Sequence, residues 1–148
     1  MDSALFFARL SGMNWVENRV KREAAIKLDG VSFWGKLATS INDAVESYNV
    51  HYGPEHGKVT CDPRGNAVCL ARTINTATEP VKKIERQVSF DPMKASISVV
   101  GYQIDSRDMI AMDAEEDGTL ILRLARNGDE ITCDAASEET VKSFLFRR

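Results

Sequence analysis

The stretch IERQVSFDPMKASISV, residues 84–99, decides the fold of this chain of 148 residues. Apolar and polar side chains alternate on both sides of a turn at Asp91–Lys94, where Pro92 suits the first central position of a type I turn. Alternation with a period of two residues predicts a pair of antiparallel strands, dry on one face and wet on the other. A turn closed by Asp91 and Lys94 would place Val88 opposite Ile97.

The same alternation surrounds two further turns, at residues 63–66 and 126–129. Asn127-Gly128 is a strong signal for a two-residue type I′ loop, and we expect a two-residue loop at Arg64-Gly65 as well. The predicted pairs are Val59 with Leu70, Cys61 with Val68, Leu122 with Cys133 and Leu124 with Ile131. Each register gathers apolar side chains on one face, and a slip by one residue would turn them to the other face.

Two helices are predicted before the first hairpin, and they would cover the dry face. Asn14, with Glu17 three residues later, resembles a capping box at the start of a helix over residues 14–28, which Asp29-Gly30 would end. Its apolar stripe recurs every four residues, at Val16, Val20, Ala24 and Leu28. The second helix, over residues 32–51, starts at Ser32 and has the clearer helical periodicity.

Three other segments complete the predicted architecture. Residues 1–12 could form a short helix, and residues 102–117 fit either a strand or a helical turn. Ser137 is expected to cap a last helix over residues 137–148. The predicted fold is α+β in a single domain, residues 1–148. N-terminal helices (1–53) pack on one face of a mainly antiparallel six- or seven-stranded meander (58–135), and a short C-terminal helix closes it.

Composition and charge narrow the class of protein. Hydrophobic residues make up 43% and charged residues 28% of the chain, which is ordinary for a globular domain. A net charge of -3 offers no field that would attract nucleic acid. The three cysteines include no CxxC pair, and we expect free thiols, with Cys61 inward and Cys69 outward. Without a signal peptide or a membrane-spanning apolar run, a cytoplasmic protein is expected, with no membrane partner.

The sequence offers no established catalytic or metal motif. GxSxG, HExxH and the glycine-rich phosphate-binding patterns do not occur. His51, Glu55 and His56 are possible zinc ligands, but their spacing is not that of a known site, so a solvated linker is the favoured interpretation. The acidic run 113–118 lacks the ligand pattern of an EF-hand. We therefore expect no metal, no cofactor and, on balance, no enzymatic activity.

Arg86 is the one charged residue that we place on the dry face. A buried arginine needs a partner, so its head should reach the sheet edge or a helix carboxylate such as Asp43 or Glu46. The alternative is a pocket between helix 32–51 and the sheet, in which Arg86 binds an acidic ligand beside Trp34 and Tyr48. A small basic patch of Arg72, Lys82 and Lys83 with Arg86 is expected at an exposed end of the sheet.

The favoured hypothesis for function is a non-enzymatic interaction module, homodimeric through the wet outer face of the sheet. That face carries small and scattered apolar side chains, which can pack against another chain. Its expected contact residues are Ser89, Ser96, Ser98, Val100, Ile121 and Arg123. The alternative is a small-molecule binder or modest enzyme that uses the pocket around Arg86.

Overall fold

The computed structural model describes residues 14–74, 82–102, 104, 107–115 and 119–146. It confirms the α+β class: a long helix α2 (Trp15–His51) and a short helix α3 (Gly53–His56) precede a seven-stranded antiparallel meander, and a helix α4 (Cys133–Leu145) follows it. The strands are β1 (Val59–Arg64), β2 (Ala67–Ile74), β3 (Lys82–Asp91), β4 (Ser96–Val100), β5 (Arg107–Ala114), β6 (Leu120–Leu124) and β7 (Glu130–Ile131).

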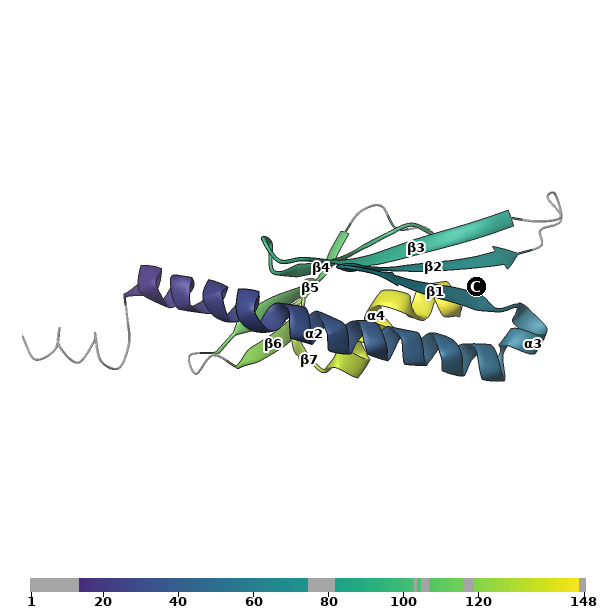
Figure 1. Ribbon diagram of the computed structural model, residues 1–148, viewed down its shortest axis with the longest axis horizontal. Coiled ribbons are helices and arrows are strands. Elements are labelled where there is room, and N and C mark those ends of the chain that lie inside the picture. The colour runs from purple at the N-terminus through teal and green to yellow at the C-terminus, as the bar shows by residue number, and fades with distance from the viewer. Residues whose placement is uncertain (1–13, 75–81, 103, 105–106, 116–118, 147–148) are drawn as a thin grey trace, which may run out of the picture.

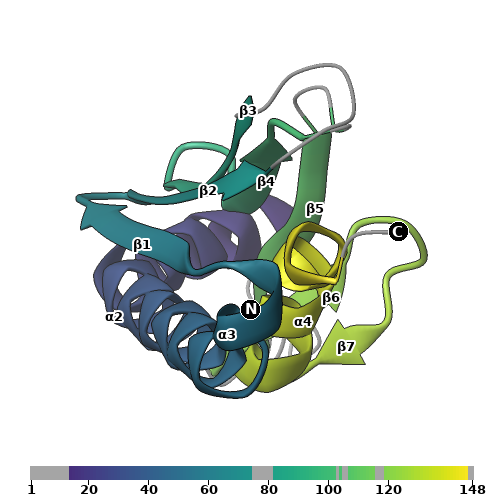
Figure 2. The same cartoon turned by 90° about the vertical axis from the view of Figure 1, so that its right-hand side faces the viewer.

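The sheet curves around the two helices, in the order β1-β2-β3-β4-β5-β6-β7 (Figure 2). α2 runs along the inner face of the sheet and continues past its end, while α4 lies beside the C-terminal half of α2 (Figure 1). The core fills the space between helices and sheet. It includes Leu37, Ile41 and Val45 of α2, Phe144 of α4, and Val88, Ile97, Ile110 and Leu122 of the sheet.

α2 is continuous through Gly30, so the predicted break at Asp29-Gly30 and the predicted second start at Ser32 are wrong. Gly30 is buried, and a Cβ atom there would lie 3.1 Å from Cζ of Phe90. This glycine lets an aromatic ring of β3 approach the helix and does not end it. The cap at Asn14 is confirmed, because its Oδ1 accepts a hydrogen bond of 2.9 Å from the Glu17 amide.

All three predicted hairpin registers are wrong by two residues. Val88 pairs with Val99, Val59 with Arg72, and Leu122 with Ile131. In the first hairpin the loop is at Gly65-Asn66, and the other two loops are longer than expected. An even shift keeps every side chain on its predicted face, so alternation determined the faces while the turns set the register.

In the chain after Gly101, the start of the last helix differs from the prediction. Arg107–Ala114 form strand β5, so of the two alternatives for residues 102–117 the strand is confirmed over this described part. α4 begins at Cys133, since the Thr132 hydroxyl accepts a 3.2 Å hydrogen bond from the Ala135 amide and caps the helix. The predicted cap Ser137 is therefore inside the helix and buried, and Cys133 is helical and not paired with Leu122. The possible helix at residues 1–12 lies outside the described residues.

Candidate functional site

Arg86 is buried, with 2% of its surface exposed, and its guanidinium contacts four oxygen atoms. It donates hydrogen bonds to the carbonyl oxygens of Tyr102 (2.9 Å), Thr140 (3.2 Å) and Gly101 (3.4 Å). It also donates to the Ser143 hydroxyl at 2.7 Å. These contacts join β3 to α4 and to the chain that follows β4.

The predicted carboxylate partner of Arg86, Asp43 or Glu46, is wrong. α4, and not α2, lies over this part of β3, and it offers carbonyl and hydroxyl oxygens. The guanidinium carbon lies 5.7 Å from the ring centroids of both Tyr102 and Phe144. Burial lowers the pKa of Arg86 from its ordinary value, but aromatic faces and carbonyl dipoles still favour the cation.

Arg72 is a second buried arginine, with 5% of its surface exposed, and the sequence analysis placed it in an exposed basic patch. It donates hydrogen bonds to the carbonyl oxygens of Leu145 (3.2 Å), Phe144 (3.4 Å) and His56 (2.8 Å). It also donates to the Tyr48 hydroxyl at 3.2 Å. The sequence does carry a signal for this burial, because Arg72 continues the alternate positions of β2 whose side chains face inward.

The two arginines hold the C-terminal part of α4 against the sheet. The last carbonyl groups of a helix have no partner within it and carry a partial negative charge. Arg72 donates to carbonyls in the last turn of α4, and Arg86 donates one turn earlier. This arrangement gives both side chains a structural role, although Nε of Arg72 is buried without a hydrogen-bond partner among the described residues.

The three residues of the predicted pocket do not converge on one cavity. Trp34 packs against Phe90, at 6.2 Å between ring centroids, and its Nε1 donates to the Gly65 carbonyl at 3.2 Å. Tyr48 lies under Arg72, at the edge of a groove between α2 and α4. Arg86 borders a different, shallow groove on the outer side of the sheet.

The groove between α2 and α4 has a volume of about 690 Å³. Apolar side chains form much of its lining, including Val141, Leu145 and Phe146 of the α4 segment. Phe146 and Tyr52 are half-exposed, and their rings meet edge to face at 5.2 Å. Charged side chains of both signs line it as well, so it is an amphipathic groove.

The predicted outer-face contacts are less accessible than expected. Ser96 and Ile121 are only 6% and 7% exposed. Ser98 donates a 2.6 Å hydrogen bond to Asp108, and the Nε of Arg123 lies 3.7 Å from Oδ2 of Asp113. Val100 is still exposed to a partner, and Ser89 lies opposite Ser98 on the neighbouring strand. These residues form only a small apolar surface.

A different apolar surface lies on the N-terminal half of α2, and we call it the α2 stripe. Val16, Val20, Leu28 and Val31 are 48%, 61%, 80% and 59% exposed, with Ala24 between them. At about 100° per residue, these five side chains fall within an arc of about 120° on the helix. The four-residue periodicity of the sequence identifies most of this stripe, which we expected to cover the dry face of the sheet.

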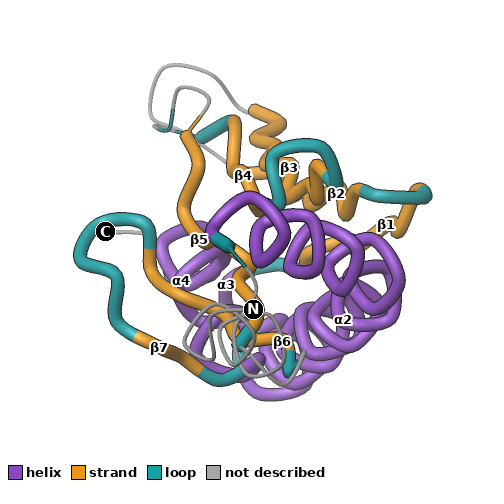
Figure 3. The backbone as a smooth tube through the Cα atoms, turned by 90° about the vertical axis from the view of Figure 1, so that its left-hand side faces the viewer, coloured by secondary structure: helices purple, strands orange, loops and turns teal. Residues whose placement is uncertain are grey.

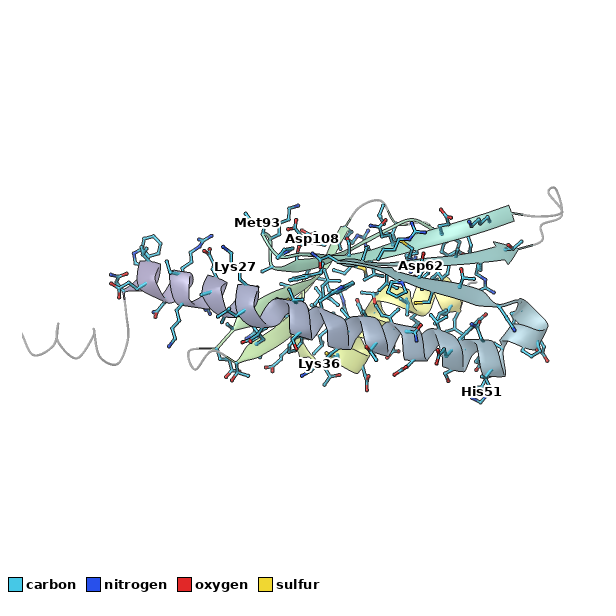
Figure 4. The ribbon with its side chains drawn as sticks, viewed as in Figure 1. Lys27, Lys36, His51, Asp62, Met93 and Asp108 are labelled. Atoms are coloured by element: carbon cyan, nitrogen blue, oxygen red, sulfur yellow. The ribbon has the colours of Figure 1, made fainter. Side chains whose placement is uncertain are left out.

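The first turns of α2 extend beyond the sheet (Figure 1), whereas Leu28 and Val31 are exposed on either side of the buried Gly30, where the helix packs against Phe90. Viewed from the N-terminal end of α2, the strands cover only part of its circumference (Figure 3). Arg22 fastens the other side of the projecting half to the end of β5, donating to the Ala114 carbonyl at 3.1 Å. Figure 4 shows Lys27 on the projecting half and Lys36 and His51 farther along the same helix.

The remaining candidates show no developed site within the described part of the chain. His56 lies 3.8 Å from Glu55, and no group of three potential metal ligands occurs among the described residues. Cys61, Cys69 and Cys133 are free thiols, as predicted. Burial is the main cause that raises the pKa of Cys61 and of Cys133. None of the described helices is both long and apolar enough to cross a membrane.

Comparisons with protein-family models, with curated proteins and with solved structures found no match to this chain. The assignment of function therefore rests on the geometry of the α2 stripe and of the groove between α2 and α4.

Proposed function

We propose that this chain is a non-enzymatic protein-interaction module, and that a partner chain packs against the α2 stripe. The observation that carries the proposal is the exposure of four aliphatic side chains on one side of a projecting helix. Full burial of one such side chain stabilises a complex by roughly 1.5–3 kcal/mol before the costs of association. Amphipathic helices commonly bind partners through anchors with this spacing.

The α2 stripe is a better candidate than the outer face of the sheet. The large aliphatic side chains of the stripe are all at least 48% exposed, whereas Ser96 and Ile121 of the outer face are nearly fully covered. The outer face also carries the charged pair of Arg123 and Asp113, whose desolvation would oppose binding. A cytoplasmic location and the absence of nucleic-acid and membrane partners stay predictions from the sequence.

The test compares which chains co-purify with tagged forms of the protein. Leu28→Asp places a carboxylate in the α2 stripe and should abolish co-purification of any partner, including an untagged copy of the chain. Val50→Asp is the matched control, because Val50 is 72% exposed on the same helix but lies outside the stripe. If every chain that co-purifies with the wild type is retained by Leu28→Asp, the proposal is refuted.

A second candidate function is the binding of an elongated apolar acid in the groove between α2 and α4. A volume of about 690 Å³ lies within the usual range of ligand sites, roughly 300–1,000 Å³. Lys36 lines the groove and could contact a carboxylate, while Val141 and Leu145 would contact the apolar part. Lys142 also lines the groove but pairs with Glu138 at 3.3 Å. The acid site of this candidate lies between two helices, whereas the sequence hypothesis put it around Arg86.

Titration with laurate, followed by NMR, tests this candidate. Ser47→Trp would fill the groove from α2 and should weaken laurate binding at least tenfold. Ser32→Trp, also exposed on α2 but outside the groove, should leave binding unchanged. Equal laurate binding by both variants, or none by the wild type, would remove the candidate.

A further inference from the structure

We infer that the partner on the α2 stripe is a second copy of this chain, packed antiparallel across a two-fold axis beside Ala24. This inference rests on the proposed function and specifies its partner. The stripe is self-complementary, as a two-fold interface requires. With the axis at Ala24, a residue n positions before Ala24 in one copy is level with the residue n positions after Ala24 in the other copy.

The apolar positions of the α2 stripe match under this symmetry. Val20 and Leu28 lie four residues before and after Ala24, so Val20 of one copy is level with Leu28 of the other. Helices that cross along this four-residue ridge would bring the two side chains into contact. Val16 lies eight residues before it and Val31 seven residues after it, so these two also meet at nearly the same level. Ala24 itself, the smallest side chain of the stripe, stands where the two helices approach most closely.

Charge supports the same arrangement. Glu23 and Lys27 lie along one edge of the α2 stripe, since positions four residues apart differ by only about 40° around a helix. In an antiparallel pair, residues of the same edge meet across the interface. Glu23, which also pairs with Arg19 of its own helix at 3.1 Å, then lies only two residues, about 3 Å along the axis, from the level of Lys27 of the other copy. This is within reach of both side chains, and the two-fold axis forms the contact twice.

The shape of the subunit also favours antiparallel packing. The sheet and α4 accompany the C-terminal part of α2, and the N-terminal part projects beyond them (Figure 1). An antiparallel pair puts the two sheets at opposite ends of the joined helices. A parallel pair would bring both sheets to the same end, with the β1–β2 tips close to the helix contact, because Trp34 donates to the Gly65 carbonyl there.

Sedimentation equilibrium of the purified chain is the first test. The wild type should form a concentration-dependent dimer, and Ala24→Trp should shift it to the monomer by separating the helices. Val50→Asp, outside the stripe, should remain a dimer. A monomeric wild type at the highest soluble concentration overturns the inference. The proposed function would then be tested separately, by whether another chain co-purifies with the wild type but not with Leu28→Asp.

Charge exchange tests the register. Glu23→Lys and Lys27→Glu should each weaken the dimer about tenfold, because each converts two ion pairs to repulsive contacts. The double variant Glu23→Lys/Lys27→Glu restores opposite charges and should recover most of the affinity. Asp43→Lys, an equal change of charge in the groove on the same helix, should have little effect. Failure of the double variant to recover affinity contradicts this register.

Cross-linking tests the direction of the two helices. In a mixture of Val20→Cys and Leu28→Cys chains, oxidation should give a disulfide between position 20 of one chain and position 28 of the other, identified by mass spectrometry. Oxidation of the Val20→Cys chain alone should give no disulfide between two copies of position 20. A dominant product that joins position 20 to position 20 would indicate parallel helices and overturn the antiparallel arrangement.

Discussion

Replacing Arg86 with methionine should destabilise the protein, because it removes the donors of four oxygen atoms at once. Methionine keeps most of the buried side-chain volume, so the loss is one of hydrogen bonds and not of packing. The shortest of these bonds, to Ser143 at 2.7 Å and to the Tyr102 carbonyl at 2.9 Å, carry most of the interaction. The Gly101 bond, at 3.4 Å, is weak.

The size of the effect follows from two opposing contributions. A buried polar group left without its partner costs about 1–3 kcal/mol, and two such groups give about 2–6 kcal/mol. Removing the guanidinium also removes its own desolvation cost, which offsets part of this loss. A net destabilisation of about 3 kcal/mol results. At roughly 2–4 °C per kcal/mol for a domain of this size, the Tm should fall by about 6–12 °C.

Urea unfolding followed by circular dichroism measures this change as a shift of the midpoint at constant slope. Arg64→Met is the matched control, since Arg64 lies at the end of β1 and forms only an exposed ion pair with Asp62. That pair should contribute less than about 1 kcal/mol. If Arg86→Met equals the wild type in stability or exceeds it, the arginine does not hold α4 to the sheet and the reasoning is refuted.

Three further predictions concern glycines and a thiol. By Tm, Gly35→Ala should stabilise α2 by about 0.5–1 kcal/mol, because its new Cβ meets no atom within 4 Å. Gly30→Ala should not stabilise the protein, because its Cβ would lie 3.1 Å from the Phe90 ring; equal gains at both positions would contradict this close contact. In urea unfolding, Gly101→Ala should lower the free energy of unfolding by more than about 2 kcal/mol, because φ is +100° and its Cβ would lie 2.5 Å from a carbonyl oxygen. Gly128→Ala, at φ +77° in open space, should lower it by about 1 kcal/mol, and equal losses of stability at the two positions would contradict this reasoning. Since burial raises the folded-state pKa of Cys61, the stability that the neutral thiol contributes is present below its unfolded-state pKa and declines as the pH rises through its folded-state pKa. Urea midpoints measured across this alkaline range should therefore fall less in Cys61→Ala than in the wild type, and an equal fall in both would contradict the prediction.

The sequence predicted the faces of the sheet but not its registers. Alternation records only whether a residue points in or out, and a shift by two residues leaves that unchanged. The true register depends on turn geometry, such as the left-handed conformation of Ala95 (φ 52°), for which alanine gives no sequence signal. The same limit applies to α2: Asp29-Gly30 is typical of a helix end, and only the ring of Phe90 explains the glycine inside the helix.

The candidate site was harder to predict than the fold. Periodicity identified Val16, Val20 and Leu28 as one stripe, but it cannot distinguish a stripe that faces the core from one that faces a partner. Arg72 was missed for a related reason. Its position in β2 predicts an inward side chain, whereas its charge suggests exposure, and the carbonyl groups at the end of α4 that resolve this conflict are distant in the sequence.

The length of α2 connects the fold to the proposed interface. Its 37 residues span about 55 Å at 1.5 Å per residue, whereas the longest strand, with 10 residues, spans only about 33 Å. Arg72 and Arg86 hold α4 against the C-terminal half of α2, so α4 cannot also cover the N-terminal half. One copy of the sheet and of α4 is therefore too short to bury the whole apolar side of α2. An isolated helix end with exposed valines gains little stability by itself, and packing against the same segment of a second copy would supply the missing contacts.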